Sequence, residues 1–259
     1  MNRTSISDLK AKARDQLLGN YGTATGTFAL LFVLIYAAMM IISGALTAGM
    51  TDAADPAAFS GFSFRIKSQL LGVAIAALSA TVTVGYMYIL KRISEGARPT
   101  ASDLFFVFRN HPDKVIIISL VMAVIQFILL MPATIAGSSV YQATVEDIDG
   151  RQFLIYVILY LAGLIISFII DLMLAMSYLI YLEDPAAGAL DMMKQSIAMM
   201  KGNKFRYFYM YLSFLGYWLL IVLSLGIAAL WVMPYQCMTM IEFYTDLRDN
   251  GTYARVEEL

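Results

Sequence analysis

Residues 153–182 read FLIYVILYLAGLIISFIIDLMLAMSYLIYL and contain a single charged residue, Asp171. A helix needs about 20 mainly apolar residues to cross the ~30 Å hydrocarbon core of a bilayer. A run of this length and composition is typical of a membrane-spanning helix, and it decides the fold class. Further stretches without charged residues lie at Thr25–Met50, Ser68–Leu90, Val115–Ser138 and Tyr207–Ile241.

The last of these stretches is long enough for two helices. As one helix its 35 residues would extend about 52 Å, which exceeds the thickness of the bilayer core even with tilt. Two spans at 205–223 and 227–247, joined by a turn at Ser224–Gly226, fit better, because glycine adopts the backbone angles of tight turns. Pro234 then falls inside the sixth span and is expected to kink it. The competing interpretation is five spans followed by a long tilted or re-entrant segment.

The composition of the whole chain also indicates an integral membrane protein. Of its 259 residues, 60% are hydrophobic and 14% are charged, and the mean hydropathy is +0.71, whereas soluble domains carry about 25% charged residues. The net charge of −1 provides no basic surface for nucleic acid. A single cysteine and a single histidine exclude an internal disulfide and His-rich metal sites. We therefore expect no metal, no cofactor and no nucleic-acid partner.

The distribution of basic residues predicts the orientation, because Lys and Arg concentrate on the cytoplasmic side of a membrane. With the N-terminus inside, the cytoplasmic segments hold 15 of the 18 Lys and Arg residues and the outer segments hold three. The predicted fold is therefore an all-α membrane protein with both termini cytoplasmic. It is a six-transmembrane-helix bundle forming a single domain over residues 1–259, with spans at 25–50, 68–90, 115–138, 153–182, 205–223 and 227–247.

Three cytoplasmic segments are amphipathic and resemble one another. They predict interfacial helices at about 4–18, 100–110 and 187–201. Each segment ends near an asparagine, namely Asn20, Asn110 and Asn203, and a hydrophobic span follows each one. This pattern favours a three-fold internal repeat of one interfacial helix and two spans. The alternative is that any cytoplasmic loop is amphipathic where it lies on a bilayer.

Ionisable groups inside spans are costly and are therefore candidate functional residues. Asp171, with Ser167 one helical turn before it, would bind a cation, relay a proton or hold a polar ligand. The alternative is a structural carboxylate capped by hydroxyls from neighbouring helices. Glu242, near the end of the sixth span, is expected to extend to the interface or to pair with Lys204 or Arg206. The candidate ligand or ion residues are Asp171, Glu242, Ser167 and Tyr178.

Aromatic and small residues also follow the spans. Tyrosines crowd the fifth span, and most are expected to anchor it at the membrane interface. A groove for an acyl chain or a hydrophobic peptide is the alternative. The second span carries small residues, including Gly72 and Gly85, that let helices approach closely.

Three stretches are distinctive enough to compare with known families: RTSISDLKAKARDQLLGNYG at 3–22, SIAMMKGNKFRYFYMYLSFLGYWLL at 196–220 and LWVMPYQCMTMIEFYTDL at 230–247. They resemble an uncharacterised bacterial integral-membrane family, the domain of unknown function 975, over almost the whole chain. The chain is more remotely similar to the membrane domain of some glycerophosphodiester phosphodiesterases. The first resemblance implies a multi-span helical fold in a bacterial plasma membrane. It carries no established activity, so it assigns no catalytic residue.

The chain is therefore interpreted as a non-enzymatic membrane module that handles lipids or other amphiphiles, or that binds a partner. Its expected partners are membrane lipids and either a second copy or another membrane protein. The alternative function is a small transporter or channel in which Asp171 faces a polar cavity. Intramembrane proteolysis is disfavoured because it needs two converging aspartates, and only Asp171 lies deep in a span.

Overall fold

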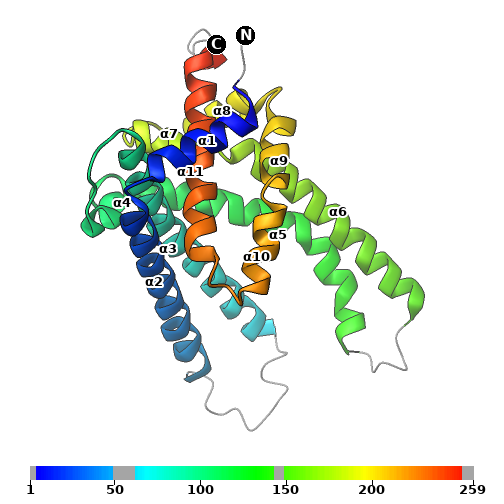
Figure 1. Cartoon of the computed structure of the whole chain (residues 1–259). Coiled ribbons are helices and arrows are strands. Elements are labelled where there is room, and N and C mark those ends of the chain that lie inside the picture. The colour runs from blue at the N-terminus through cyan, green and yellow to red at the C-terminus, as the bar shows by residue number, and fades with distance from the viewer. Residues whose placement is uncertain (1–3, 49–61, 143–148, 253–259) are drawn as a thin grey trace.

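The computed structural model describes residues 4–48, 62–142 and 149–252, and every regular element within these ranges is helical (Figure 1). Five stretches are long and apolar enough to cross a membrane. They contain α2 (Tyr21–Ala48), α3 (Phe62–Ser94), α5 (Pro112–Gln142), α6 (Gly150–Leu174) with α7 (Ser177–Glu183), and α9 (Lys204–Leu212) with α10 (Leu215–Leu223). The all-α membrane fold is thus confirmed, although the end of the predicted first span, 49–50, lies outside the described residues.

The sixth predicted span corresponds to α11 (Ala229–Leu247), which is not among these five stretches. Its sequence is more polar, because Gln236, Thr239 and Glu242 interrupt the apolar residues. Figure 1 shows α11 standing upright in the middle of the bundle, where it contacts α1 (Ile6–Leu17), α2, α3 and α10. Twelve of its 19 residues are buried. This helix is therefore shielded by protein more than the five apolar stretches are.

A tight turn joins α10 to α11 at the predicted position. Leu225 and Gly226 have φ angles of 53° and 92°, and glycine adopts the second without strain. The Gly226 N–H donates to the Ile221 carbonyl at 2.8 Å, which ends α10. Apolar residues dominate the tip, and Leu225 is 93% exposed. In Figure 1 the turn ends above the lower ends of α2 and α5.

Short helices precede three of the spans, as predicted. They are α1, the 3₁₀ helix η2 (Ala101–Phe105) continued by α4 (Phe106–Arg109), and α8 (Ala189–Met200). Ser5 caps α1 by accepting the Asp8 N–H at 3.1 Å. The apolar stripe of α1, namely Leu9, Ala13 and Leu17, is buried.

The three predicted asparagines end these helices in the same way. The side-chain amides of Asn20, Asn110 and Asn203 each donate to the carbonyl four residues earlier, at 3.3, 2.9 and 3.0 Å. The backbone N–H of each asparagine donates to the carbonyl three residues earlier, at 2.9, 3.1 and 3.0 Å. Asparagine therefore binds carbonyls that the end of a helix would leave without a partner.

Two spans that the sequence predicts as continuous are broken, which corrects the prediction for 153–182 and 205–223. The first break, between α6 and α7, exposes backbone groups that Ser196 of α8 binds. Its hydroxyl donates to the Met173 carbonyl at 2.8 Å and accepts the Met176 N–H at 3.1 Å. The second break, between α9 and α10, exposes the Ser213 carbonyl, which Lys10 of α1 binds through its Nζ at 2.9 Å. Breaks inside spans are tolerated where other groups bind the freed backbone atoms.

Helix α3 approaches η2 closely at Gly85. A Cβ atom on Gly85 would lie 1.9 Å from the Leu104 carbonyl oxygen, so only glycine fits there. The rings of Tyr88 and Phe106 stack beside this contact, with centroids 3.8 Å apart. Gly85, predicted to allow a close approach, therefore packs against a backbone carbonyl of η2.

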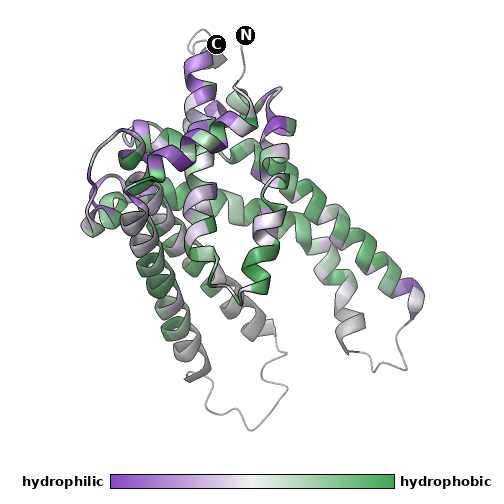
Figure 2. Cartoon of the chain, in the orientation of Figure 1, coloured by the Kyte–Doolittle hydropathy of each residue, from purple (hydrophilic) through white to green (hydrophobic). Residues whose placement is uncertain are grey.

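Apolar and polar surfaces separate along the bundle. Figure 2 shows hydrophobic residues along α2 and α6, whereas hydrophilic residues gather around α1 and the end of α11. Many large apolar side chains of α6 are exposed, including Leu154 and Ile165 at 58% and 62%. The α5–α6 hairpin diverges from α9 and α10 towards its far end (Figure 1). The buried core lies instead around α11, and Phe243 and Tyr244 are among its largest fully buried side chains.

Candidate functional site

The break between α9 and α10 places a group of aromatic rings beneath α1. The ring centroids of Phe214, Tyr217 and Tyr235 lie 5.2 to 5.7 Å from one another. The Lys10 Nζ lies 4.1 Å from the centroid of Phe214 and 5.4 Å from that of Tyr217. Lys10 therefore holds α1 over this aromatic group through both its backbone hydrogen bond and its contacts with the rings.

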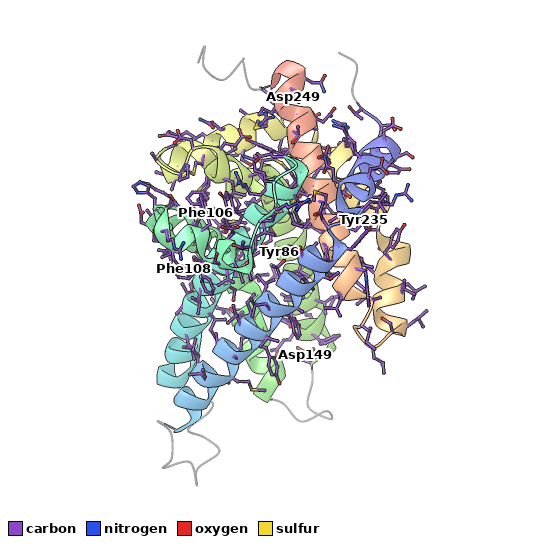
Figure 3. All side chains as sticks on the ribbon, turned by 60° about the vertical axis from the view of Figure 1, so that its left-hand side comes forward. Tyr86, Phe106, Phe108, Asp149, Tyr235 and Asp249 are labelled. Atoms are coloured by element: carbon purple, nitrogen blue, oxygen red, sulfur yellow. The ribbon has the colours of Figure 1, made fainter. Side chains whose placement is uncertain are left out.

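A pocket of about 370 Å³ opens beside the aromatic group, and we call it the α1 pocket. Figure 3 labels Tyr235, which belongs to its wall. Contributions come from α1, the start of α2, α10, and α11 with the turn before it. The lining residues are Arg14, Tyr21, Tyr217, Leu220, Ala228, Trp231, Val232 and Tyr235.

The lining of the α1 pocket changes from polar to apolar along its depth. Arg14 and Tyr21 lie where α1 meets α2. Lys10 of α1 binds the Ser213 carbonyl just before α10, and Lys12 of α1 pairs with Glu242 of α11. Tyr217 and Tyr235 therefore lie nearer α1 along these two helices than do Leu220 and Ala228. Lining of this kind, charged at one end and aliphatic at the other, suits an amphiphilic molecule.

Arg14 lines the polar end of the α1 pocket, and Lys10, which is not itself a lining residue, lies next to Tyr217 of the wall. Lys10 and Arg14 are four residues apart on α1 and therefore share one face of it. Burial, and secondly the positive charge of Arg14, lower the pKa of Lys10 below its ordinary value. Within the described residues, no carboxylate lies within ion-pairing distance of Arg14.

Ion pairs anchor α1 to the rest of this end of the bundle. Lys12 Nζ lies 3.2 Å from Oε2 of Glu242, whose side chain is 3% exposed. Arg206 Nη2 lies 2.6 Å from Asp246 Oδ2 and also donates to the Thr4 carbonyl at 2.6 Å. The Thr4 hydroxyl donates to the other oxygen of Asp246. The segment from Thr4 to Lys12 is thereby fixed to α9 and α11.

A second group of charges joins the ends of α3, α7 and α11. Glu183 accepts hydrogen bonds from Arg248 and from Lys91, the latter at 3.4 Å. Burial alone would lower the pKa of Arg248, but Glu183 and Asp249 beside it raise that pKa above its ordinary value. These contacts fix helix ends and take no part in the α1 pocket.

The prediction that Glu242 pairs with Lys204 or Arg206 is wrong. Its partner is Lys12, while Arg206 binds Asp246 one helical turn further along α11. The reason is that α1 lies across α11 and reaches Glu242 first (Figure 1). Glu242 therefore belongs to the contacts that hold α1 in place.

Asp171 lies half-buried on α6, where Gln126 of α5 donates to its Oδ1 at 3.4 Å. The expected hydroxyl caps do not hydrogen-bond to it. Ser167 is buried and its hydroxyl has no hydrogen-bond partner within the described residues. Tyr178 donates to Met122 Sδ at 3.9 Å. Glu242 does not belong to this group, because it pairs with Lys12.

The sequence analysis missed Gln126 and the α1 pocket. Gln126 is uncharged, so the positions of charged residues within the spans do not indicate it. The pocket joins residues about 200 positions apart, from Arg14 to Tyr217, and no local pattern indicates that pairing. The crowding of tyrosines in the fifth span was the one available signal, because Tyr217 belongs to the pocket wall.

Comparisons with known proteins give one match. A family model described as "Protein of unknown function (DUF975)" matches residues 1–251. No curated protein and no solved structure matches the chain. The remoter likeness to the membrane domain of glycerophosphodiester phosphodiesterases is not shown by these comparisons.

Proposed function

The chain belongs to the DUF975 family, a family of unknown function, and from its helical membrane fold we propose that it is a non-enzymatic membrane protein that handles lipids or similar amphiphiles. The observation that carries this proposal is the α1 pocket, whose lining passes from Arg14 through aromatic rings to Leu220 and Ala228. The bilayer also changes from polar headgroups to apolar chains along the direction of the spans. An amphiphile that lies parallel to the spans would therefore match the lining of the pocket.

The proposed setting is a bacterial plasma membrane, with both termini cytoplasmic and α11 as a sixth span. Support comes from the concentration of basic residues in the predicted cytoplasmic segments and from the tight turn between α10 and α11. The three asparagines that close α1, α4 and α8 alike support the proposed three-fold repeat of an interfacial helix and two spans. The exposed apolar face of α6 suits either lipid or a partner, which would be a second copy or another membrane protein.

The sixth span predicts the accessibility of the turn at Leu225. In a Cys237→Ser background, which removes the only cysteine of the chain, we expect a Leu225→Cys variant in intact cells to react with a membrane-impermeant maleimide. A cysteine introduced at Leu18, exposed beside α1, should react only after the cells are opened. Protection of position 225 in both conditions would favour the re-entrant alternative instead.

Lipid handling predicts that the chain retains lipid when it is purified. Native mass spectrometry of the full chain in mild detergent should show bound phospholipid and should also give the number of subunits. Ala228→Phe, which fills the α1 pocket, is expected to remove most of the bound lipid. Ile158→Phe, on the exposed face of α6, should leave it in place.

A folded wild-type chain without bound lipid would contradict the proposed function. The second candidate, a transporter or channel, rests on the hydrogen bond of Gln126 to Asp171 inside two apolar spans. Flux across liposomes that Asp171→Asn abolishes, together with an absence of retained lipid, would establish that candidate in its place.

A further inference from the structure

We propose that the α1 pocket selects a phospholipid with an anionic headgroup, which binds at Lys10 and Arg14 while one acyl chain runs towards Ala228. This inference rests on the proposed lipid handling and adds the class of lipid and its orientation. It is carried by the charges at the mouth of the pocket and by the order of the residues along its depth.

The charges at the mouth lack a carboxylate of their own. Lys12 and Arg206 have acidic partners in Glu242 and Asp246, whereas no acid within the described residues lies within 4 Å of the Arg14 guanidinium. Like charges four residues apart on a helix repel each other. An anion between Lys10 and Arg14 would relieve this repulsion, and a guanidinium binds phosphate oxygens through two parallel hydrogen bonds.

The position of Arg14 suits a headgroup in particular. It lies seven residues before the start of α2 at Tyr21, where the first apolar stretch begins. Tyr21, Tyr217 and Tyr235 follow it in the pocket wall, and tyrosine concentrates at the level of headgroups in membrane proteins. The cations and the aromatic wall therefore lie in the order in which a phospholipid presents its phosphate and its glycerol region.

The deeper part of the α1 pocket suits an acyl chain. Leu220, Ala228, Trp231 and Val232 line it without a charged group. Beyond it the surface continues as exposed apolar residues of α10, such as Leu219 at 60% and Val222 at 71%. The volume of about 370 Å³ holds part of one chain, and the remainder continues over this apolar surface into the bilayer. A hydrophobic peptide would gain less from the paired cations.

Trp231 allows a direct test, because the chain has two tryptophans and the other, Trp218, is not part of the pocket lining. The full-length Trp218→Phe variant, reconstituted in phosphatidylcholine nanodiscs, reports through Trp231 alone. We expect phosphatidylglycerol with brominated chains to quench this fluorescence at about fivefold lower mole fraction than brominated phosphatidylcholine, since one basic residue near a membrane surface contributes about this factor.

Substitutions at Arg14 and Trp231 test whether the headgroup preference arises at the α1 pocket. Arg14→Gln in the same background should remove most of the headgroup preference, whereas Arg92→Gln, which changes another exposed arginine, should retain it. The variant Trp231→Phe, which leaves Trp218 alone, should show no preference between the two brominated lipids. Inorganic phosphate at millimolar concentration should not relieve the quenching, because the acyl chain contributes to binding.

Equal quenching by the two brominated lipids, or a preference that survives Arg14→Gln, would overturn this inference. Relief of the quenching by inorganic phosphate would identify a free anion as the ligand and would overturn it as well. These results are separable from failure of the proposed function, because native mass spectrometry would still show retained lipid without a headgroup preference. Should Trp218→Phe fail to fold, the difference between wild type and Trp231→Phe gives the same contribution from Trp231.

Discussion

Gly85→Ala is expected to lower the free energy of unfolding by about 3 kcal/mol or more, because overpacking against atoms that cannot move is costly. The added Cβ would lie 1.9 Å from the Leu104 carbonyl oxygen and 2.8 Å from its carbonyl carbon. Both are backbone atoms, so the clash cannot be relieved by rotating a side chain. Separating α3 from η2 would also expose Leu104 and Val107, which are fully buried.

The measurement is thermal unfolding of the purified protein in detergent, followed by intrinsic fluorescence. Gly72→Ala is the matched control, because it lies on the same helix and its Cβ would have no atom within 4 Å. That variant should unfold within about 2 °C of wild type, as surface substitutions usually do. If the two variants lose equal stability, the contact with Leu104 is not the reason why position 85 requires glycine.

Arg206→Ala is expected to cost about 3–5 kcal/mol, the usual effect of removing one partner of a buried ion pair. The side chains of Arg206 and Asp246 are 13% and 6% exposed, and their charged atoms lie 2.6 Å apart. Without the guanidinium, Asp246 keeps the Thr4 hydroxyl and the Asn250 amide, at 2.9 Å, but no positive charge. The Thr4 carbonyl also loses its donor, so the start of α1 should detach.

Thermal unfolding measures the loss of stability, and limited proteolysis near Thr4 measures the detachment of α1. Lys194→Ala is the control, since its pair with Asp191 at 3.3 Å is exposed on both sides, and such pairs contribute little. The double variant Arg206→Met with Asp246→Leu should recover much of the loss, because no charge then stays buried. An unchanged stability of Arg206→Ala would show that this ion pair does not fix α1.

The sequence predicted those features that local chemistry determines. Gaps between charges located the five stretches that could cross a membrane, and glycine in Ser224–Gly226 located the turn, because tight turns need its backbone angles. The asparagines ended their helices as expected. Each of these signals lies within a few residues of the structure that it predicts, so no knowledge of the tertiary fold was needed.

The missed features depend on residues far apart in the chain. No proline or glycine lies at Ser213–Phe214, and the break there is stable because Lys10, about 200 residues away, binds the freed carbonyl. Glu242 was expected to pair with Lys204 or Arg206, near the same end of the bundle, yet its partner is Lys12. The α1 pocket likewise exists only after α1 has docked against α10 and α11.

The contacts of α1 also determine the order in which this protein is completed. The partners of Thr4, Lys10 and Lys12 are Asp246, Ser213 and Glu242, so α1 is synthesised long before the residues that hold it. At about 5–20 residues per second, α1 waits roughly 10–45 s for these partners. During that interval its apolar stripe can rest on the bilayer surface, and docking exchanges that contact for α11. The docking of α1 therefore follows the synthesis of α9 and α11 rather than preceding it.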